Sequence, residues 1–186
     1  MEKLFIKISG LSELLMNNPA SMESTGPIPT PEKEAERSRY AIKDGKLYIP
    51  SIALRKSILL GATGYKIGKF SLRSRLAASI QLFDECFFIT DEKGKSLEKY
   101  TIDRRRVVIG KAGIIRSRAR IELPWVVEGI FGFNSELLMD RHGIVQVELL
   151  KKAINIAGQV SGLLDFRPSK GGWFGKYELV DIDILE

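Results

Sequence analysis

The sequence has one cysteine, Cys86, and one histidine, His142, among its 186 residues. A single cysteine excludes a disulfide within the chain. One histidine and one cysteine are also too few for the Cys/His ligand set of a zinc site, so we expect no metal and no other cofactor. Cys86 lies in the apolar run FDECFFI, which favours a buried, unreactive thiol over a nucleophile.

Long apolar runs are missing too. No stretch approaches the ~18 apolar residues that a membrane-spanning helix requires. The opening MEKLFIKISG carries Glu2, Lys3 and Lys7, which indicates a strand rather than a secretory signal. We therefore expect a cytoplasmic protein without a membrane partner. The spacing of a phosphate-binding P-loop and a serine-nucleophile motif are absent as well.

A surplus of positive charge is present. The chain has 29 Lys and Arg against 23 Asp and Glu, a formal net charge of +6. Its 44% apolar and 28% charged residues are typical of a globular protein, and its length fits one domain spanning 1–186. A basic surplus favours anionic partners, nucleic acid first and a membrane surface second.

The hydrophobic periodicity predicts an α+β fold. Period-two alternation indicates strands and period-3.6 stripes indicate helices, with glycines between them. The expected elements are strands at 3–9, 46–49, 125–133 and 176–185, a helix from Ser51 with Ile52, Ile58, Leu59 and Ala62 buried, a hairpin around 110–113, and a helix over 147–161. Reduced to its core, this order is β-α-β-β-α-β, a ferredoxin-like (RRM-like) arrangement with an inserted β-hairpin region and a long loop after the first strand.

The stretch 11–40 differs from the rest of the chain. It has four prolines, many small polar residues and a cluster of charges, which predicts no core element. Two interpretations stay open: a disordered loop, or a flexible finger that becomes ordered on a partner. Leu14, Leu15 and Met16 at its base are apolar enough to pack.

Two basic stretches suggest contact with nucleic acid. In the helix from Ser51, Arg55 and Lys56 lie off the buried stripe. Residues 65–75 interleave Tyr65 and Phe70 with basic side chains, a composition that suits phosphate contact and base stacking. The basic candidates there are Lys66, Lys69 and Arg73. The alternative is a solvated basic loop.

Three arginines alternate along one predicted strand. Because strand side chains alternate, Arg116, Arg118 and Arg120 share one face, where they repel one another unless an anion lies across them. A phosphate backbone fits such a row, and the adjoining segment adds Arg104, Arg105, Arg106 and Lys111. The alternative is a surface strand neutralised by Glu122, Glu128 and the acidic residues of 91–103.

A glycine-rich segment, 162–179, separates the last helix from the last strand. Its glycines allow backbone N–H groups to converge on an anion, or allow close packing of the chain. Its aromatic rings, with Phe166 among them, can stack on bases, although we expect at least one to pack on the core. The candidates are Arg167, Lys170, Gly171, Gly172, Trp173, Phe174, Gly175 and Lys176.

A helix, a glycine-rich loop and a final strand at the end of a ferredoxin-like core resemble the RAMP superfamily of CRISPR-associated proteins. The segments LFIKISGLSELLMNN, IPSIALRKSILLGA and AGQVSGLLDFRPSKGGWFGKYEL carry this resemblance, in particular to the backbone subunit that coats guide RNA in multi-subunit effectors, or to a compact phage or mobile-element relative. The resemblance implies a scaffold of antiviral defence that binds single-stranded RNA largely independently of sequence. Its implied partners are copies of itself along the strand and other effector subunits. The position of Gly171, Gly172 and Gly175 matches the family's glycine loop.

Two alternatives remain. One is an endoribonuclease of the same superfamily, with His142 as general acid or base. The other is a basic metabolic or structural domain. Single-stranded DNA is the alternative ligand to RNA. Because a lone loop histidine is more often a bystander, binding without catalysis is the leading hypothesis.

Overall fold

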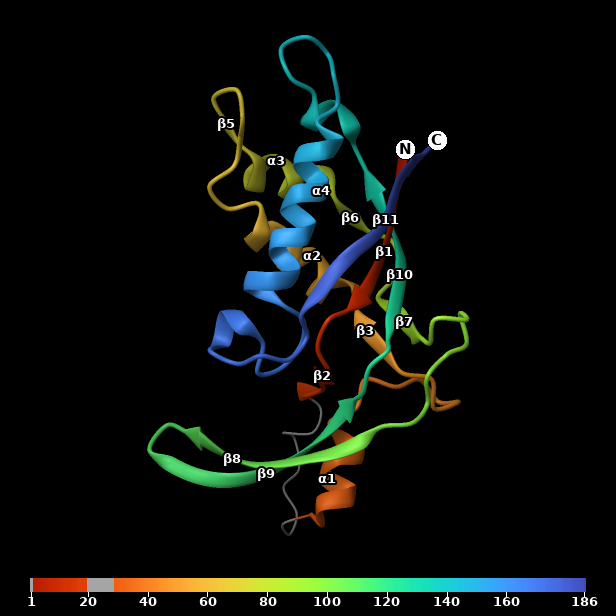
Figure 1. The fold of residues 1–186 in the computed structure, drawn as a ribbon, viewed down its shortest axis with the longest axis vertical. Coiled ribbons are helices and arrows are strands. Elements are labelled where there is room, and N and C mark those ends of the chain that lie inside the picture. The colour runs from red at the N-terminus through yellow and green to blue at the C-terminus, as the bar shows by residue number, and fades with distance from the viewer. Residues whose placement is uncertain (1, 20–28) are drawn as a thin grey trace.

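An antiparallel sheet forms the centre of the fold, with the strand order β11-β1-β10-β7-β3 and β6 paired beside β7 on β10. The computed structural model describes residues 2–19 and 29–186. Figure 1 shows the sheet with helices on one side and a separate hairpin below it. The strands are β1 (Glu2–Gly10), β3 (Tyr48–Pro50), β6 (Gln81–Leu82), β7 (Cys86–Thr90), β10 (Val126–Phe133) and β11 (Tyr177–Leu185). The predicted α+β class is confirmed.

Two helices cover one face of this sheet (Figure 1). They are α2 (Ser51–Gly61) and α4 (Val147–Ile156), which continues as a π-helical turn at Ala157–Ser161. The core lies between them and the inward residues of β1, Leu4, Ile6 and Ile8, which are fully buried. None of the described helices is long and apolar enough to cross a membrane.

The predicted details of α2 need correction. Ile52 is 36% exposed, and Leu54 and Ile58 are the buried aliphatic residues of the helix. Pro50 occupies the N-cap position, and the Ser51 hydroxyl donates to the Asp84 carbonyl oxygen at 2.5 Å. The stretch after α2 was predicted only as a basic segment, yet it forms β4 (Lys66–Ile67), β5 (Phe70–Ser71) and α3 (Leu72–Ser79).

The predicted hairpin is confirmed as β8 (Thr101–Ile109) and β9 (Ala112–Ile121). It pairs with β2 (Leu14–Leu15) in a separate sheet of order β2-β9-β8, and it projects as a curved arm below the helices (Figure 1). Helix α1 (Pro31–Arg37) packs on β9. There the Ser38 hydroxyl accepts a hydrogen bond from the Ala119 amide at 2.8 Å.

The described parts of 11–40 are more ordered than the sequence predicts. Leu14, Leu15 and Met16 are fully buried, as expected. The prediction that no core element forms here is wrong, because α1 begins at Pro31 with Thr30 as its cap and buries Ala35. The apolar pattern of this helix is too weak to predict it, because Ala35 is its only buried residue. The rest of the predicted finger, residues 20–28, lies outside the described residues.

Strand β11 forms one edge of the central sheet. Its register shifts opposite Lys7 and Ile8, which confirms the irregularity predicted near Val180. Three of its amides are bonded to side chains. The Leu179 N–H donates to Asn155 Oδ1, the Ile182 N–H to Asp181 Oδ1, and the Ile184 N–H to Asp183 Oδ1, each at 2.9 Å.

Candidate nucleic-acid interface

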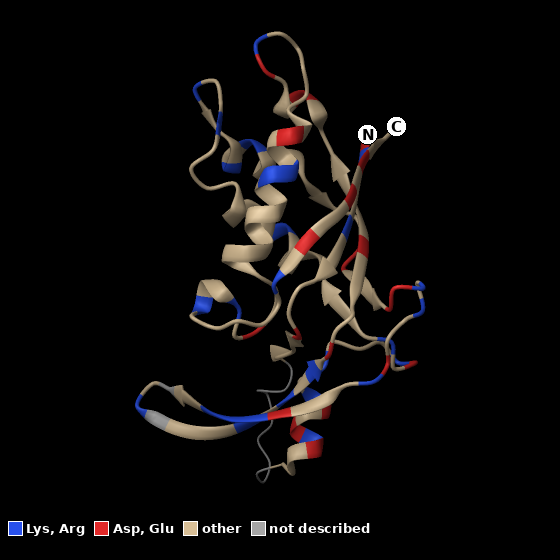
Figure 2. Cartoon of the chain, in the orientation of Figure 1, with Lys and Arg blue, Asp and Glu red and all other residues tan. Residues whose placement is uncertain are grey.

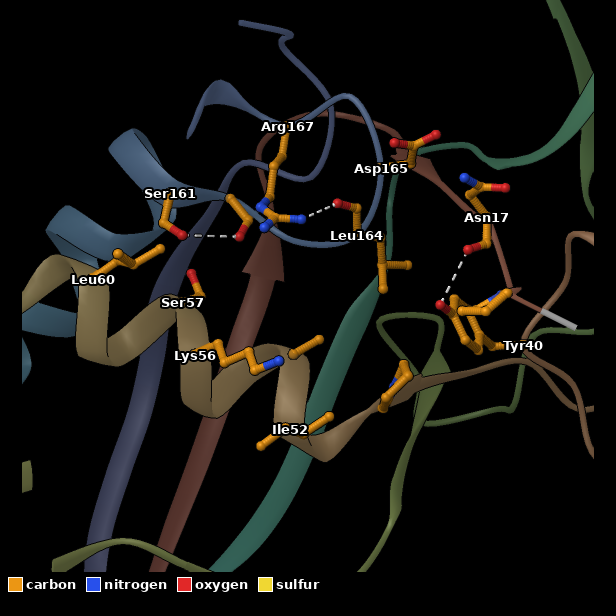
Figure 3. A pocket seen from close by; sticks show the side chains of 14 residues that line it. Asn17, Tyr40, Ile52, Lys56, Ser57, Leu60, Ser161, Leu164, Asp165 and Arg167 are labelled. Atoms are coloured by element: carbon orange, nitrogen blue, oxygen red, sulfur yellow. Dashed lines mark hydrogen bonds between the residues drawn. The ribbon is translucent and has the colours of Figure 1, made fainter. Parts of the chain in front are cut away.

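Two adjoining cavities lie where α2, the glycine-rich segment and the hairpin meet. Their volumes are 430 and 610 Å³, and Asn17, Asp165 and Arg167 line both. Figure 3 shows the first cavity, with the side chains of α2 facing the loop that carries Arg167. We call the two together the cationic groove. Its charged lining residues are Lys56, Arg105, Arg106, Arg116, Arg118, Arg167, Lys170 and Asp165.

The lining of the groove is strongly positive. Seven of these residues are Lys or Arg, and Asp165 is the one acid among the described residues that line it. Figure 2 shows the basic residues continuing along the hairpin. Charges of one sign along a concave surface concentrate ions of the opposite sign, so the groove is suited to an anionic ligand.

The predicted arginine row is not an exposed phosphate track. Arg118 is only 5% exposed, and it pairs with Asp165 at 2.5 Å and Asp103 at 3.6 Å. The outer two arginines also have acidic partners: Arg116 with Glu34 at 2.5 Å, and Arg120 with Glu122 at 3.3 Å and Glu13 at 3.7 Å. The expectation of three free arginines is therefore wrong. Acidic residues neutralise the row, as the alternative interpretation proposed. That interpretation named Glu122 and, among the acids of 91–103, Asp103. It did not name the other three partners, Glu13, Glu34 and Asp165.

Some hydrogen-bonding capacity in the groove is nevertheless unused. Among the described residues, Arg118 Nε and Nη2 and Asn17 Oδ1 are buried atoms without a hydrogen-bond partner. Both side chains line the groove. Buried polar atoms almost always have partners, so those that lack one need an explanation. Arg118 Nη2 lies 3.6 Å from Asp103 Oδ2, so its charge has a counter-ion although no hydrogen bond forms.

An aromatic cluster holds Arg105 beside the groove. Its guanidinium lies 5.0–5.6 Å from the ring centroids of Phe166, Trp173 and Phe174. The same side chain bonds to both carboxylate oxygens of Asp103. Phe174 is 1% exposed, which confirms that at least one of these rings packs on the core, whereas Trp173 is 53% exposed. Trp173 is therefore the ring of this cluster with the most surface for a base.

The glycines of the segment serve close packing of the chain. A Cβ at Gly172 would lie 1.8 Å from the Phe166 carbonyl oxygen, and one at Gly175 would lie 2.1 Å from that of Leu163. Their amides already donate within the chain: Gly171 to Pro168, Gly172 to Arg167 and Gly175 to Glu13. Of the two uses proposed for these glycines, the contacts favour a tight loop over a cradle of free N–H groups.

The remaining candidates are spread over the molecule. Arg55 donates to the carbonyl oxygens of Ala77 and Ile80 at 2.6 and 3.0 Å, which ties α2 to α3. Lys176 is half-buried, and its amide donates to the Ser12 hydroxyl. Exposed positions outside the groove lining are Lys66, Lys69, Arg73, Arg104 and Lys111. Of these, Lys66, Lys69 and Arg73 belong to the β4–β5–α3 region, at the opposite end from the hairpin (Figure 1).

His142 lies apart from the groove, on an exposed turn after Asp140. Arg141 Nε donates to its Nε2 at 2.9 Å. Hydrogen bonds from the Ile144 and His142 amides lower the pKa of Asp140. In the groove lining, burial raises the pKa of Tyr40, whose hydroxyl donates to the Asn17 carbonyl oxygen at 3.2 Å. Among these described residues, no histidine faces the same cavity as a second group that could transfer a proton.

Metal binding finds no support in the described residues, which contain no group of three or more His, Cys, Asp or Glu side chains able to hold an ion. Comparison with protein-family models gives no match, and comparison with curated protein sequences gives none either.

Proposed function

We propose that this chain is a scaffold subunit that binds single-stranded RNA in the cationic groove, largely independently of sequence. Single-stranded DNA is the alternative ligand. The observation that carries the proposal is the groove itself, which has seven Lys and Arg in its lining, four of them (Lys56, Arg106, Arg167 and Lys170) without an ion pair among the described residues. Under this proposal the partners are RNA, further copies of the chain and other effector subunits, in the cytoplasm.

Recognition without sequence preference fits the chemistry of the lining. Contacts from Lys and Arg to phosphates position a strand without reading its bases. An exposed aromatic ring stacks on any base, because every base has a π-face. Trp173, whose ring centroid lies 5.1 Å from the Arg105 guanidinium carbon, supplies such a ring next to the basic side chains of the groove.

The fold assignment within this proposal is a ferredoxin-like core of the RAMP kind. Two features support it. The path β11-β1-β10-β7 is antiparallel throughout, with α2 between β1 and β7 and α4 between β10 and β11. The glycine-rich segment lies between α4 and β11, where the resemblance puts it. Strands β3 and β6 are additions to that core.

Binding is favoured over cleavage. The ribonuclease alternative requires His142 to reach the scissile phosphate, and His142 lies outside the groove lining. His142→Ala therefore leaves both RNA affinity and RNA integrity unchanged. Time-dependent RNA cleavage that disappears in this variant would replace the scaffold proposal with the nuclease one.

Fluorescence anisotropy with labelled oligonucleotides of mixed and uniform sequence tests the proposal. We expect similar affinities for all sequences and a log–log salt slope of about −0.7 per phosphate contacted. Lys56→Ala/Arg106→Ala/Lys170→Ala removes three groove charges and weakens binding at least tenfold. Lys66→Ala/Lys69→Ala/Arg73→Ala removes three charges at the far end and is the matched control. Equal losses in both variants would assign binding to net charge rather than to the groove.

A further inference from the structure

Two loops project from the end of the molecule opposite the hairpin (Figure 1). One is the turn that joins β4 to β5, and the other is the segment 140–145, which precedes α4. Each presents a large apolar side chain to solvent: Phe70 is 60% exposed and Ile144 is 61% exposed. A single exposed apolar residue is ordinary, but two on neighbouring loops indicate an interaction surface. We call the two loops, with the exposed start of α3, the end patch.

The side chain of Arg75 on α3 joins the two loops. Its guanidinium carbon lies 4.4 Å from the centroid of the Phe70 ring. Its Nη1 donates to the carbonyl oxygens of Leu137 and Met139 at 2.9 and 3.2 Å. Met139 in turn pairs with Val145 across the base of the second loop. Because one side chain holds both loops, their tips can meet one surface together.

The second loop is preformed by its own hydrogen bonds. Asp140 Oδ1 accepts from the amides of His142 and Ile144 at 2.8 and 3.1 Å. The other carboxylate oxygen accepts from Gln146 Nε2 at 3.1 Å. Gly143 has φ +76°, which lets the chain reverse tightly. The loop therefore presents Ile144 to solvent without needing further ordering, which lowers the cost of binding a partner.

The end patch is positively charged (Figure 2). Its exposed cations are Lys66 and Lys69 of the first loop, Arg73 on α3 and Arg141 of the second loop. None of these four forms an ion pair among the described residues. Residues 45–83 contain no Asp or Glu. Unpaired cations around two apolar tips suit a partner whose surface is anionic and whose interior is apolar.

We propose that the end patch binds the surface of a bilayer that contains anionic lipids. Headgroups attract the four cations, and the two apolar tips enter the boundary between headgroups and acyl chains. Only loop tips take part, so the lack of a membrane-spanning run, on which the expectation of no membrane partner rests, does not bear on this contact. A nucleic-acid strand is also anionic, but Ile144 has no ring on which a base could stack.

Co-sedimentation of the full chain with vesicles tests the proposal in the absence of RNA. We expect the chain to pellet with vesicles of phosphatidylcholine and phosphatidylserine, and to stay in solution with vesicles of phosphatidylcholine alone. Lys66→Ala/Lys69→Ala/Arg73→Ala removes three charges of the end patch and weakens binding about tenfold or more. Lys56→Ala/Arg106→Ala/Lys170→Ala removes three charges of the cationic groove and keeps the parental vesicle binding.

A second variant tests the apolar tips separately. Phe70→Ser/Ile144→Ser keeps every charge and weakens binding to the anionic vesicles about tenfold, because headgroup attraction alone remains. The loss is clearest at high salt, which screens that attraction. Val160→Ser/Val180→Ser removes two other apolar side chains, 55% and 53% exposed, and is the matched control that binds like the parent. Circular dichroism checks that each variant folds.

Three results would overturn the proposal: a parent chain that does not pellet with the anionic vesicles, a Phe70→Ser/Ile144→Ser variant that binds them like the parent, or a loss of oligonucleotide binding in that variant. The last result would make the end patch a nucleic-acid surface. The inference does not depend on the proposed function. Vesicle binding in a parent chain that fails to bind RNA would overturn the proposed function alone.

Discussion

Arg118 on β9 and Asp165 in the glycine-rich segment form an ion pair of 2.5 Å that joins the hairpin to the core. Arg118 also faces Asp103 across the hairpin, in register. A side chain expected to contact phosphate thus instead holds two parts of the protein together. The cationic groove therefore depends on a buried ion network for its shape.

The first prediction concerns this network. Asp165→Ala leaves the buried Arg118 without its nearest counter-charge, which lowers the free energy of unfolding by about 3 kcal/mol. Urea denaturation measures the change. Glu122→Ala, which removes an exposed partner of Arg120, costs about 0.5 kcal/mol or less and is the control. Equal effects of the two substitutions would contradict the buried role of Arg118.

The glycine-rich segment gives the second prediction. Gly172→Ala forces its Cβ into the Phe166 carbonyl oxygen and destabilises the fold by about 3 kcal/mol. Gly171→Ala meets no atom within 4 Å but has φ +78°, so it costs only about 1 kcal/mol. The thermal unfolding midpoints of the two variants measure this difference, and we expect the midpoint of Gly172→Ala to be the lower one. A Gly172→Ala protein of parental stability that has lost RNA binding would restore the cradle interpretation.

Trp173 carries the third prediction. If a base stacks on it, Trp173→Ala weakens RNA binding by about 1–3 kcal/mol, and Trp173→Phe restores part of that loss. The chain's other tryptophan, Trp125, is fully buried, and its Nε1 donates to the Ser12 carbonyl oxygen. RNA therefore quenches tryptophan fluorescence in the parent but leaves it unchanged in Trp173→Phe. Quenching that persists in this variant would exclude Trp173 as the stacking ring.

The fourth prediction is a pH dependence of stability. Hydrogen bonds from the Ser135 amide and hydroxyl lower the pKa of Glu2 from its ordinary 4.5. A lowered folded-state pKa stabilises the fold above the unfolded-state pKa, and this contribution is lost as the pH falls through the folded-state pKa. Glu2→Gln therefore lowers stability at pH 7 and flattens the loss of stability below pH 4.5. Parallel urea midpoint curves for parent and variant over pH 7 to 3 would contradict this.

The sequence predicts elements better than it predicts contacts. The alternation of β1, the stripe of α4 and the hairpin follow from local periodicity, and each forms as predicted. The partners of Arg116 and Arg118 are Glu34 and Asp165, which are 82 and 47 residues away, so local patterns contain no signal for them. Asp103 and Arg105 are two residues apart on one strand face, and that spacing could have revealed their pair.

The residues that line the cationic groove were likewise predictable in part. The basic stretches predicted Lys56, Arg106, Arg167 and Lys170, which the fold brings together around one groove. Asn17 was missed, because a polar residue in a proline-rich stretch has no periodicity that could place it beside the hairpin. Composition identified the charge, and tertiary packing determined which charges share a surface.

The hydrogen bonds from the Ile182 and Ile184 amides to aspartate side chains affect how the β11 edge meets other chains. An unpaired strand edge accepts a strand from any neighbouring chain, which leads to fused sheets and aggregation. Copies arrayed on one RNA would hold such edges at high local concentration. Asp181 and Asp183 occupy the amides of Ile182 and Ile184 and carry like charge, so neighbouring chains repel one another there instead of merging their sheets. These two aspartates therefore leave the β11 edge with fewer free N–H groups with which another strand could pair.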